Sequence, residues 1–206
     1  MHPLWVELLG FVAGVTGIFI SFPQLVRVIR LKSDIGVSFW TWLIITWTNV
    51  AWIGYGIRFD SPSQVWTNGV AALITGPLVF LLMRHRIGAV RSVLLVLATW
   101  AFGFSSCFFL PEPAPSILLM FGLTSRAPQV AASFRSWKLG RATAVSNRSY
   151  LIAIIASVIW VVYGFLMNLW AIVSFSGTVA ILSALVLMLE AGARRRALAL
   201  ADTLAP

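Results

Sequence analysis

Two pairs of side chains with complementary binding chemistry stand at the same spacing in the two halves of the sequence. Trp52 precedes Asn68 by the same number of positions as Trp160 precedes Ser176. An indole offers a flat apolar face, and an amide or hydroxyl group donates and accepts hydrogen bonds. This combination suits a small polar solute with hydroxyl groups and apolar C–H faces. A belt of interfacial indoles is the alternative explanation, because the chain contains 10 tryptophans.

The elements that hold these side chains are predicted to be membrane-spanning helices. Hydrophobic residues make up 60% of the 206 residues and charged residues only 10%, whereas soluble domains are about 45–50% apolar and about 25% charged. A span needs about 20 apolar residues. Uncharged runs of that length, one of them interrupted by Arg126, lie at residues 8–26, 35–57, 61–83, 92–111, 113–134 and 149–189. The last run accommodates two spans with a turn near Met167 and Asn168, so we predict an all-α membrane protein with seven transmembrane helices.

The basic residues predict the orientation of these spans. They concentrate in the loops after the first, third and fifth spans and after the seventh, as at Arg27, Arg84, Arg135 and Arg194. By the positive-inside rule the N-terminus is expected outside and the C-terminus in the cytoplasm, and we expect a plasma (inner) membrane location. Topology and contact with membrane lipids account for the net charge of +9. A nucleic-acid partner is therefore not expected.

The chain also repeats itself. The pair Pro23-Gln24 recurs as Pro128-Gln129, and we call this separation the proline offset. Further matches share one slightly larger separation, which we call the tryptophan offset because it relates Trp52 to Trp160. The other pairs at the tryptophan offset are Val37-Ser38 with Val145-Ser146, Tyr55-Gly56 with Tyr163-Gly164, and Asn68-Gly69 with Ser176-Gly177.

Three helices per repeat is an odd number, so one extra helix is needed for the second copy to face the same way as the first. The sequence therefore predicts two parallel triple-helix-bundle repeats joined by a linker helix, in a 3+1+3 arrangement. The expected boundaries are residues 4–87, 88–111 and 112–192, followed by a basic cytoplasmic tail at 193–206. Carriers with such symmetry bind their substrate between the repeats, near the middle of the membrane.

The duplicated motifs resemble those of the PQ-loop/MtN3-saliva family, which includes the SWEET sugar transporters and the bacterial SemiSWEETs. The stretches that carry the resemblance are Ser21–Gln24 with Lys32–Ser38, Ala127–Gln129 with Ala144–Ser146, and the two Trp-x-x-Tyr-Gly sequences. The resemblance implies that Trp52, Asn68, Trp160 and Ser176 line a central substrate pocket. The family usually has Asn where this chain has Ser176, so we expect an asymmetric pocket. The family also has prolines where Ser38 and Ser146 stand, which puts its four-proline hinge in doubt here.

Pro23 and Pro128 are candidate hinges for alternating access, because a proline removes one helical hydrogen bond. A static kink is the alternative. Gln24 and Gln129 either satisfy the backbone groups that the prolines free or face the pathway. The tyrosines of the two Trp-x-x-Tyr-Gly sequences complete this expected hinge and gating set, and they are Tyr55 and Tyr163.

Arg126 is unusual, because it is a charged residue within the fifth predicted span. Insertion of an arginine at the centre of a membrane helix costs about 2.5–3.5 kcal/mol of free energy. Either it reaches the cytoplasmic face or a wet vestibule, or it is a gate residue or an anchor for an anionic substrate. The spans hold no other interior charge, since Glu7 and Glu190 are taken to lie near span ends.

Without an acidic relay, the predicted function is an uncoupled, bidirectional facilitator of a mono- or disaccharide that works by alternating access. A carrier of another small solute, such as an amino acid or vitamin-like compound, and a non-transporting receptor are the alternatives. The chain has 1 cysteine and 2 histidines and shows no catalytic motif. An enzyme, a cofactor and a metal site are therefore not expected, and homo-oligomerisation is left open.

Overall fold

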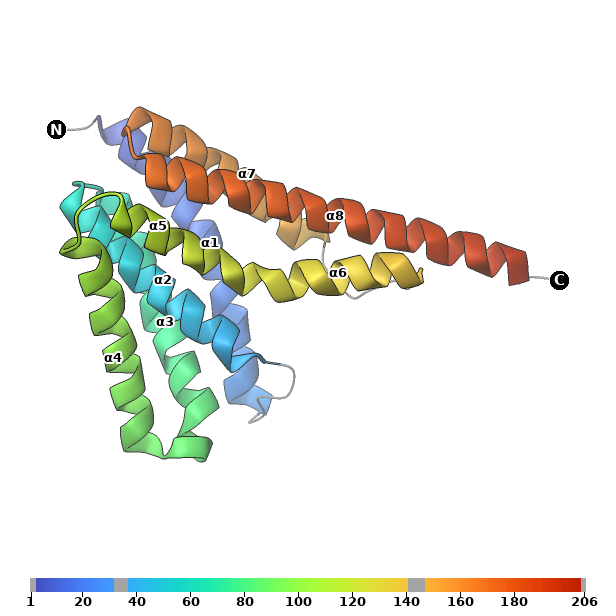
Figure 1. Ribbon diagram of the computed structural model, residues 1–206, viewed down its shortest axis with the longest axis horizontal. Coiled ribbons are helices and arrows are strands. Elements are labelled where there is room, and N and C mark those ends of the chain that lie inside the picture. The colour runs from blue at the N-terminus through green and yellow to red at the C-terminus, as the bar shows by residue number, and fades with distance from the viewer. Residues whose placement is uncertain (1–2, 32–36, 141–146, 205–206) are drawn as a thin grey trace.

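A computed structural model describes residues 3–31, 37–140 and 147–204 of the chain, and its regular elements are all helical (Figure 1). The all-α prediction is thereby confirmed. The elements are α1 (Leu4–Leu31), α2 (Phe39–Arg58), α3 (Pro62–Ile87), α4 (Ala89–Phe108), α5 (Ala114–Phe121), the 3-10 helix η1 (Gly122–Arg126), α6 (Ala127–Leu139), α7 (Asn147–Leu166) and α8 (Trp170–Leu204).

Five of the described helices are long and apolar enough to cross a membrane, namely α1, α3, α4, α7 and α8. Helix α2 has the necessary length of 20 residues, but polar side chains such as Thr48 and Asn49 interrupt its apolar sequence. Large apolar side chains such as Phe19 and Ile181 are exposed on the outside of the helices. Lipid tails as the surrounding solvent explain this exposure, since it would be unfavourable in water.

The predicted fifth span is not one continuous helix, and the irregular part lies directly before Pro128, where the sequence predicted a hinge or a kink. The chain forms α5, tightens into η1 over five residues, and resumes as α6 at Ala127. Pro128 has no backbone N–H to donate to the carbonyl of Thr124. That carbonyl instead accepts a hydrogen bond from the N–H of Ala127. In contrast, α1 continues through Pro23 without interruption.

The helices pack in two groups, the first formed by α1–α4 and the second by α5, η1 and α6–α8. Helix α3 contacts both α1 and α2, and α8 contacts both α6 and α7, while α4 packs on α2 and α3. The groups meet where α1 packs against α7 and where α2 packs against η1 and α5. Figure 1 shows that the groups converge at the end that holds the N-terminus and the α2–α3 and α7–α8 turns, and diverge toward the other end. We call these the closed end and the divergent end.

The two turns at the closed end have the same geometry. Asp60 and Asn168, which are related by the tryptophan offset, both adopt positive φ, 50° and 55°. The N–H of Ser61 donates to the carbonyl of Gly56 over 2.8 Å, and the N–H of Leu169 donates to that of Gly164 over 2.7 Å. Asp and Asn tolerate this backbone region better than most residues do, so the offset found in the sequence also relates two equivalent local structures.

Some sequence motifs fall partly outside the described residues. Lys32, Val145 and Ser146 are among those that the structure does not describe, which are residues 32–36 and 141–146 within the chain. Ser38 is described, and its side chain caps α2 by accepting a hydrogen bond from the N–H of Thr41. Residues 193–204, expected as a tail, continue α8 without a break.

Candidate solute-binding cavity

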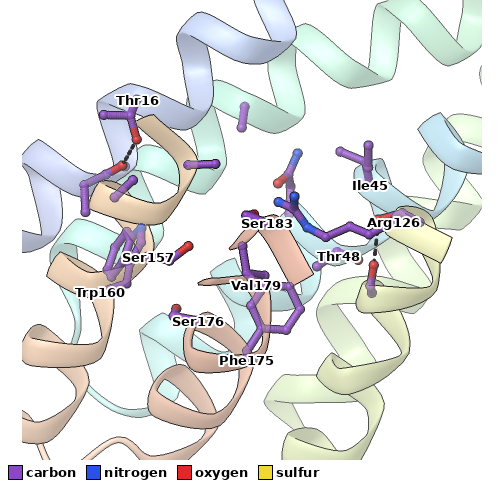
Figure 2. Close-up of a pocket in the computed structure, with 18 of the residues that line it drawn as sticks. Thr16, Ile45, Thr48, Arg126, Ser157, Trp160, Phe175, Ser176, Val179 and Ser183 are labelled. Carbon is purple, nitrogen blue, oxygen red and sulfur yellow. Dashed lines mark hydrogen bonds between the residues drawn. The ribbon is translucent and has the colours of Figure 1, made fainter. Parts of the chain in front are cut away.

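A cavity of about 390 Å³ lies between the two helix groups. Its volume falls within the range of about 300–1,000 Å³ that is typical of small-molecule sites. Trp52, Asn68, Trp160 and Ser176 all line it, so the structure brings the four predicted site residues together. Figure 2 shows Trp160 and Ser157 of α7 on one side of the space and Phe175, Ser176 and Val179 of α8 beside them.

Each of the two cavity indoles is held edge-on by the tyrosine three residues later in its helix. The ring centroids of Trp52 and Tyr55 are 5.4 Å apart with an interplanar angle of 80°, and those of Trp160 and Tyr163 are 5.3 Å apart at 89°. Phe175 adds a second edge-on contact to Trp52 at 5.4 Å. Side chains three apart share a helix face, so the Trp-x-x-Tyr spacing fixes the indoles in place.

Amide side chains line the cavity on the side formed by the first helix group. Asn68 donates through Nδ2 to the backbone carbonyl of Gln64 at 2.9 Å and to its Oε1 at 2.7 Å. Both bonds use the Nδ2 donor of Asn68, and no hydrogen bond to its Oδ1 acceptor is found among the described residues. Asn49 also lines the cavity and donates to Oγ1 of Thr75 at 3.4 Å. Sequence reasoning missed Gln64 and Asn49, although they lie four residues before Asn68 and three before Trp52 and therefore share their faces.

Arg126 projects from η1 into the cavity (Figure 2). It is the only Lys, Arg, Asp or Glu among the described residues that line this space. Gln129 also lines the cavity, and its Nε2 donates to Oγ of Ser133 at 3.2 Å. Pro23 and Pro128 do not line it and are exposed on the outside of their helices. Gln24 is half-buried and does not line the cavity either.

Comparison with known proteins relates this architecture to a transport family. No family model matches the chain. A stretch of 85 residues, 41% of the chain, is 24% identical to the sugar transporter SemiSWEET of Bradyrhizobium diazoefficiens and covers 99% of that protein. The 3.7 Å structure of a eukaryotic SWEET transporter matches with a TM-score of 0.69 and 18% identity, over 92% of this chain and 98% of that one. The chain has a SWEET-like fold.

These findings confirm the resemblance inferred from the motifs, and they indicate an integral membrane protein whose relatives are transporters rather than enzymes. The SemiSWEET match has about the length of one of the two repeats predicted from the sequence.

The closed end of the SWEET-like fold contains a buried hydrogen-bond cluster that sequence reasoning missed. Oη of Tyr163 donates to Oε1 of Glu7 at 2.9 Å, and the N–H of Ser63 donates to Oε2 of Glu7 at 2.8 Å. Oγ of Ser61 lies 2.6 Å from Oη of Tyr163. The cluster ties α1, α3 and α7 together. None of these residues lines the cavity.

Glu7 lies in the first turn of α1, near the end of its span as expected, but the burial of Glu7 and Glu190 was not predicted. Glu7 is 8% exposed and Glu190 is 0% exposed, and Oε1 of Glu190 accepts a hydrogen bond from Ser133 at 2.6 Å. The sequence contained one indication that Glu7 would be buried. It shares a helix face with Gly10 and Gly14, whose lack of a side chain lets α1 approach α3 closely.

Tyr55, the counterpart of Tyr163, makes a different contact at the same end. Its ring packs on Phe59 with centroids 4.4 Å apart, and its hydroxyl lies against the backbone of Ala171 in α8. The two tyrosines of the Trp-x-x-Tyr-Gly sequences therefore both reach from one helix group to the other at the closed end. Neither lines the cavity itself.

Proposed function

We propose that this protein carries a sugar-like solute across the membrane by alternating access, as an uncoupled and bidirectional facilitator. The observation that supports this most directly is the meeting of Trp52, Asn68, Trp160 and Ser176 at one cavity between the two helix groups. The names of the matched proteins, a sugar transporter and a SWEET transporter, support the same solute class. We propose these four residues as the solute-binding set.

The proposed architecture is the 3+1+3 arrangement, with α1–α3 and α5–α8 as parallel repeats and α4 as the linker. The packing of α3 between α1 and α2, and of α8 between α6 and α7, supports it. We place the closed end outside and the divergent end in the cytoplasm, in a plasma (inner) membrane, because the basic loops lie at the divergent end.

In the proposed cycle the closed end acts as the outer gate. For that end to open, the contacts of Tyr163 with Glu7 and Ser61 and the contact of Tyr55 with Ala171 have to separate. The helix groups would pivot near the bend at η1 and Pro128 and near Pro23. We propose no coupling ion, because the carboxyl groups of Glu7 and Glu190 are engaged in hydrogen bonds outside the cavity.

Counterflow in liposomes tests this function. Purified protein is reconstituted into vesicles loaded with unlabelled glucose, and uptake of labelled glucose is followed in both directions, with and without a proton ionophore. We expect transient accumulation of label that the ionophore leaves unchanged. Counterflow abolished by the ionophore would contradict the uncoupled mechanism, and a lack of flux for all sugars and sugar derivatives would contradict the transport function.

A further inference from the structure

The two walls of the cavity carry different chemistry, although they are related by the sequence repeat. At the tryptophan offset the first half has amides where the second has hydroxyl or apolar groups. At the proline offset the small Ser21 corresponds to the cationic Arg126. The amide pairs are Asn49 with Ser157, Gln64 with Ile172, and Asn68 with Ser176, and all of these residues except Ile172 line the cavity.

Arg126 has no protein counter-ion in the described part of the chain. No ion pair or hydrogen bond of its guanidinium is found there, and no carboxyl group lines the cavity. A guanidinium in a membrane interior is costly unless an anion or water compensates it. Its planar set of donors matches a carboxylate in a two-point geometry.

A second polar group that lines the cavity has no hydrogen-bond partner among the residues that the structure describes. Ser183 is 1% exposed, and no hydrogen bond of its Oγ is found in that part of the chain. The repeat explains why. Thr75, the counterpart of Ser183, accepts a hydrogen bond from Asn49, whereas the counterpart of Asn49 is the shorter Ser157. Ser183 of α8 and Arg126 of η1 therefore both contribute to this cavity a polar group without a protein partner among the described residues, and both are labelled in Figure 2.

We infer that the cavity takes a sugar acid, meaning a solute with one carboxylate and several hydroxyl groups, such as a hexuronate or an aldonate. The inference rests on the proposed transport function and narrows its solute class. Arg126 binds the carboxylate, and Ser183 offers one further hydrogen-bond donor to the solute from the same cavity. The amides of Asn49, Gln64 and Asn68, from the first helix group, bind the hydroxyl groups, and the indoles cover the apolar ring faces.

The charge of such a solute gives the inference a direct physical test. Uncoupled transport of a univalent anion moves one negative charge, so an imposed membrane potential drives it, whereas transport of a neutral sugar is insensitive to potential. A univalent ion at equilibrium accumulates tenfold for about 59 mV. Vesicles clamped at defined potentials with a potassium gradient and valinomycin therefore separate the two cases.

The experiment compares labelled glucuronate with labelled glucose in the same proteoliposomes. We expect wild-type protein to take up glucuronate at least tenfold faster, with about tenfold accumulation at about 59 mV inside positive. Arg126→Ser places the residue of the first repeat at this position and should lower the ratio of glucuronate uptake to glucose uptake at least tenfold. Arg126→Lys keeps the charge without the planar donors and should give an intermediate ratio.

The outcomes separate this inference from the function on which it rests. Glucose uptake without glucuronate uptake in wild-type protein would overturn the sugar-acid inference and leave facilitated sugar transport standing. A ratio that Arg126→Ser leaves unchanged would overturn the role of Arg126. Vesicles with folded, monodisperse protein that move neither solute would overturn both proposals.

Discussion

The hydroxyl group of Tyr163 donates a 2.9 Å hydrogen bond to Glu7, and this contact joins α7 to α1 at the closed end of the bundle. The two residues are 156 positions apart in the chain. Because Ser61 also lies within hydrogen-bond distance of the same hydroxyl group, a single side chain links three segments of the bundle. Removal of that hydroxyl group is therefore the most direct way to weaken the closed end.

Tyr163→Phe should destabilise the protein, because the carboxyl group of Glu7 then loses a partner in a buried position. A buried hydrogen bond to such a group contributes about 1.5–3 kcal/mol, which corresponds to a decrease in Tm of roughly 3–12 °C for a chain of this size. Thermal unfolding of the detergent-solubilised protein measures this decrease in Tm. Equal Tm values for the variant and wild-type protein would show that the contact does not hold the closed end.

Glu7→Gln should also lower Tm, and the chain offers a matched control for it. Glu112 occupies the position equivalent to Glu7 at the proline offset, but it is exposed and bonded to Ser116, four residues away. Glu112→Gln should therefore leave Tm within about 1 °C of wild type, in keeping with the small effect of most exposed substitutions. If both variants shift Tm equally, the burial of Glu7 is not what matters.

Ser157→Asn should stabilise the protein by providing Ser183 with the partner that Thr75 already has in Asn49. An unsatisfied buried polar group costs about 1–3 kcal/mol, so Tm should rise by a few degrees. The same substitution in a Ser183→Ala background should give no gain, because the group to be satisfied is gone. A gain of equal size in both backgrounds would point to cavity filling instead.

Trp52→Ala and Trp160→Ala should each reduce solute flux about five- to tenfold, because an indole face in contact with a solute contributes about as much as one hydrogen bond. Trp66→Ala is the control. Trp66 is in α3 but 66% exposed on the outside of the bundle, so flux should be maintained. The measurement is the initial uptake rate of each variant, normalised to the amount of reconstituted protein and compared with that of Trp66→Ala.

Asn68→Ala removes the acceptor that we assign to a solute hydroxyl group and should reduce flux about five- to tenfold, the equivalent of one hydrogen bond. Its effect is expected mainly on the apparent affinity. Thermal stability is the companion measurement, because Asn68 also donates to Gln64. Wild-type flux and affinity in this variant would remove Asn68 from the binding set.

The sequence predicted the broad architecture because its strongest signals are local. Apolar runs of span length and the distribution of basic residues depend only on the chain and the membrane. The repeat then related Trp52 to Trp160 and Asn68 to Ser176 without any knowledge of the packing. All four residues line one cavity.

The details that the sequence did not predict depend on contacts between distant segments. The burial of Glu7 requires α3 and α7 to close over it, and no local pattern encodes that. The break of the fifth predicted span depends on Pro128, but also on Gly122, where an added Cβ would lie 2.6 Å from Oγ1 of Thr48 in α2. Proline alone was an insufficient signal, because α1 passes Pro23 unbroken.

Helix α8 has 35 residues, and at 1.5 Å per residue it is about 52 Å long, whereas the hydrocarbon core of a bilayer is about 30 Å thick. Beyond the cavity, Arg196 stacks 4.1 Å over the indole of Trp137 in α6 and donates to its backbone carbonyl. If the second helix group rocks, the part of α8 beyond the membrane would move with it as one rigid helix. Its far end would then be displaced much farther than the cavity walls. Spin labels at the exposed Leu198 and at Val90, the second residue of α4, would turn a small rearrangement at the centre into a large, measurable change in separation.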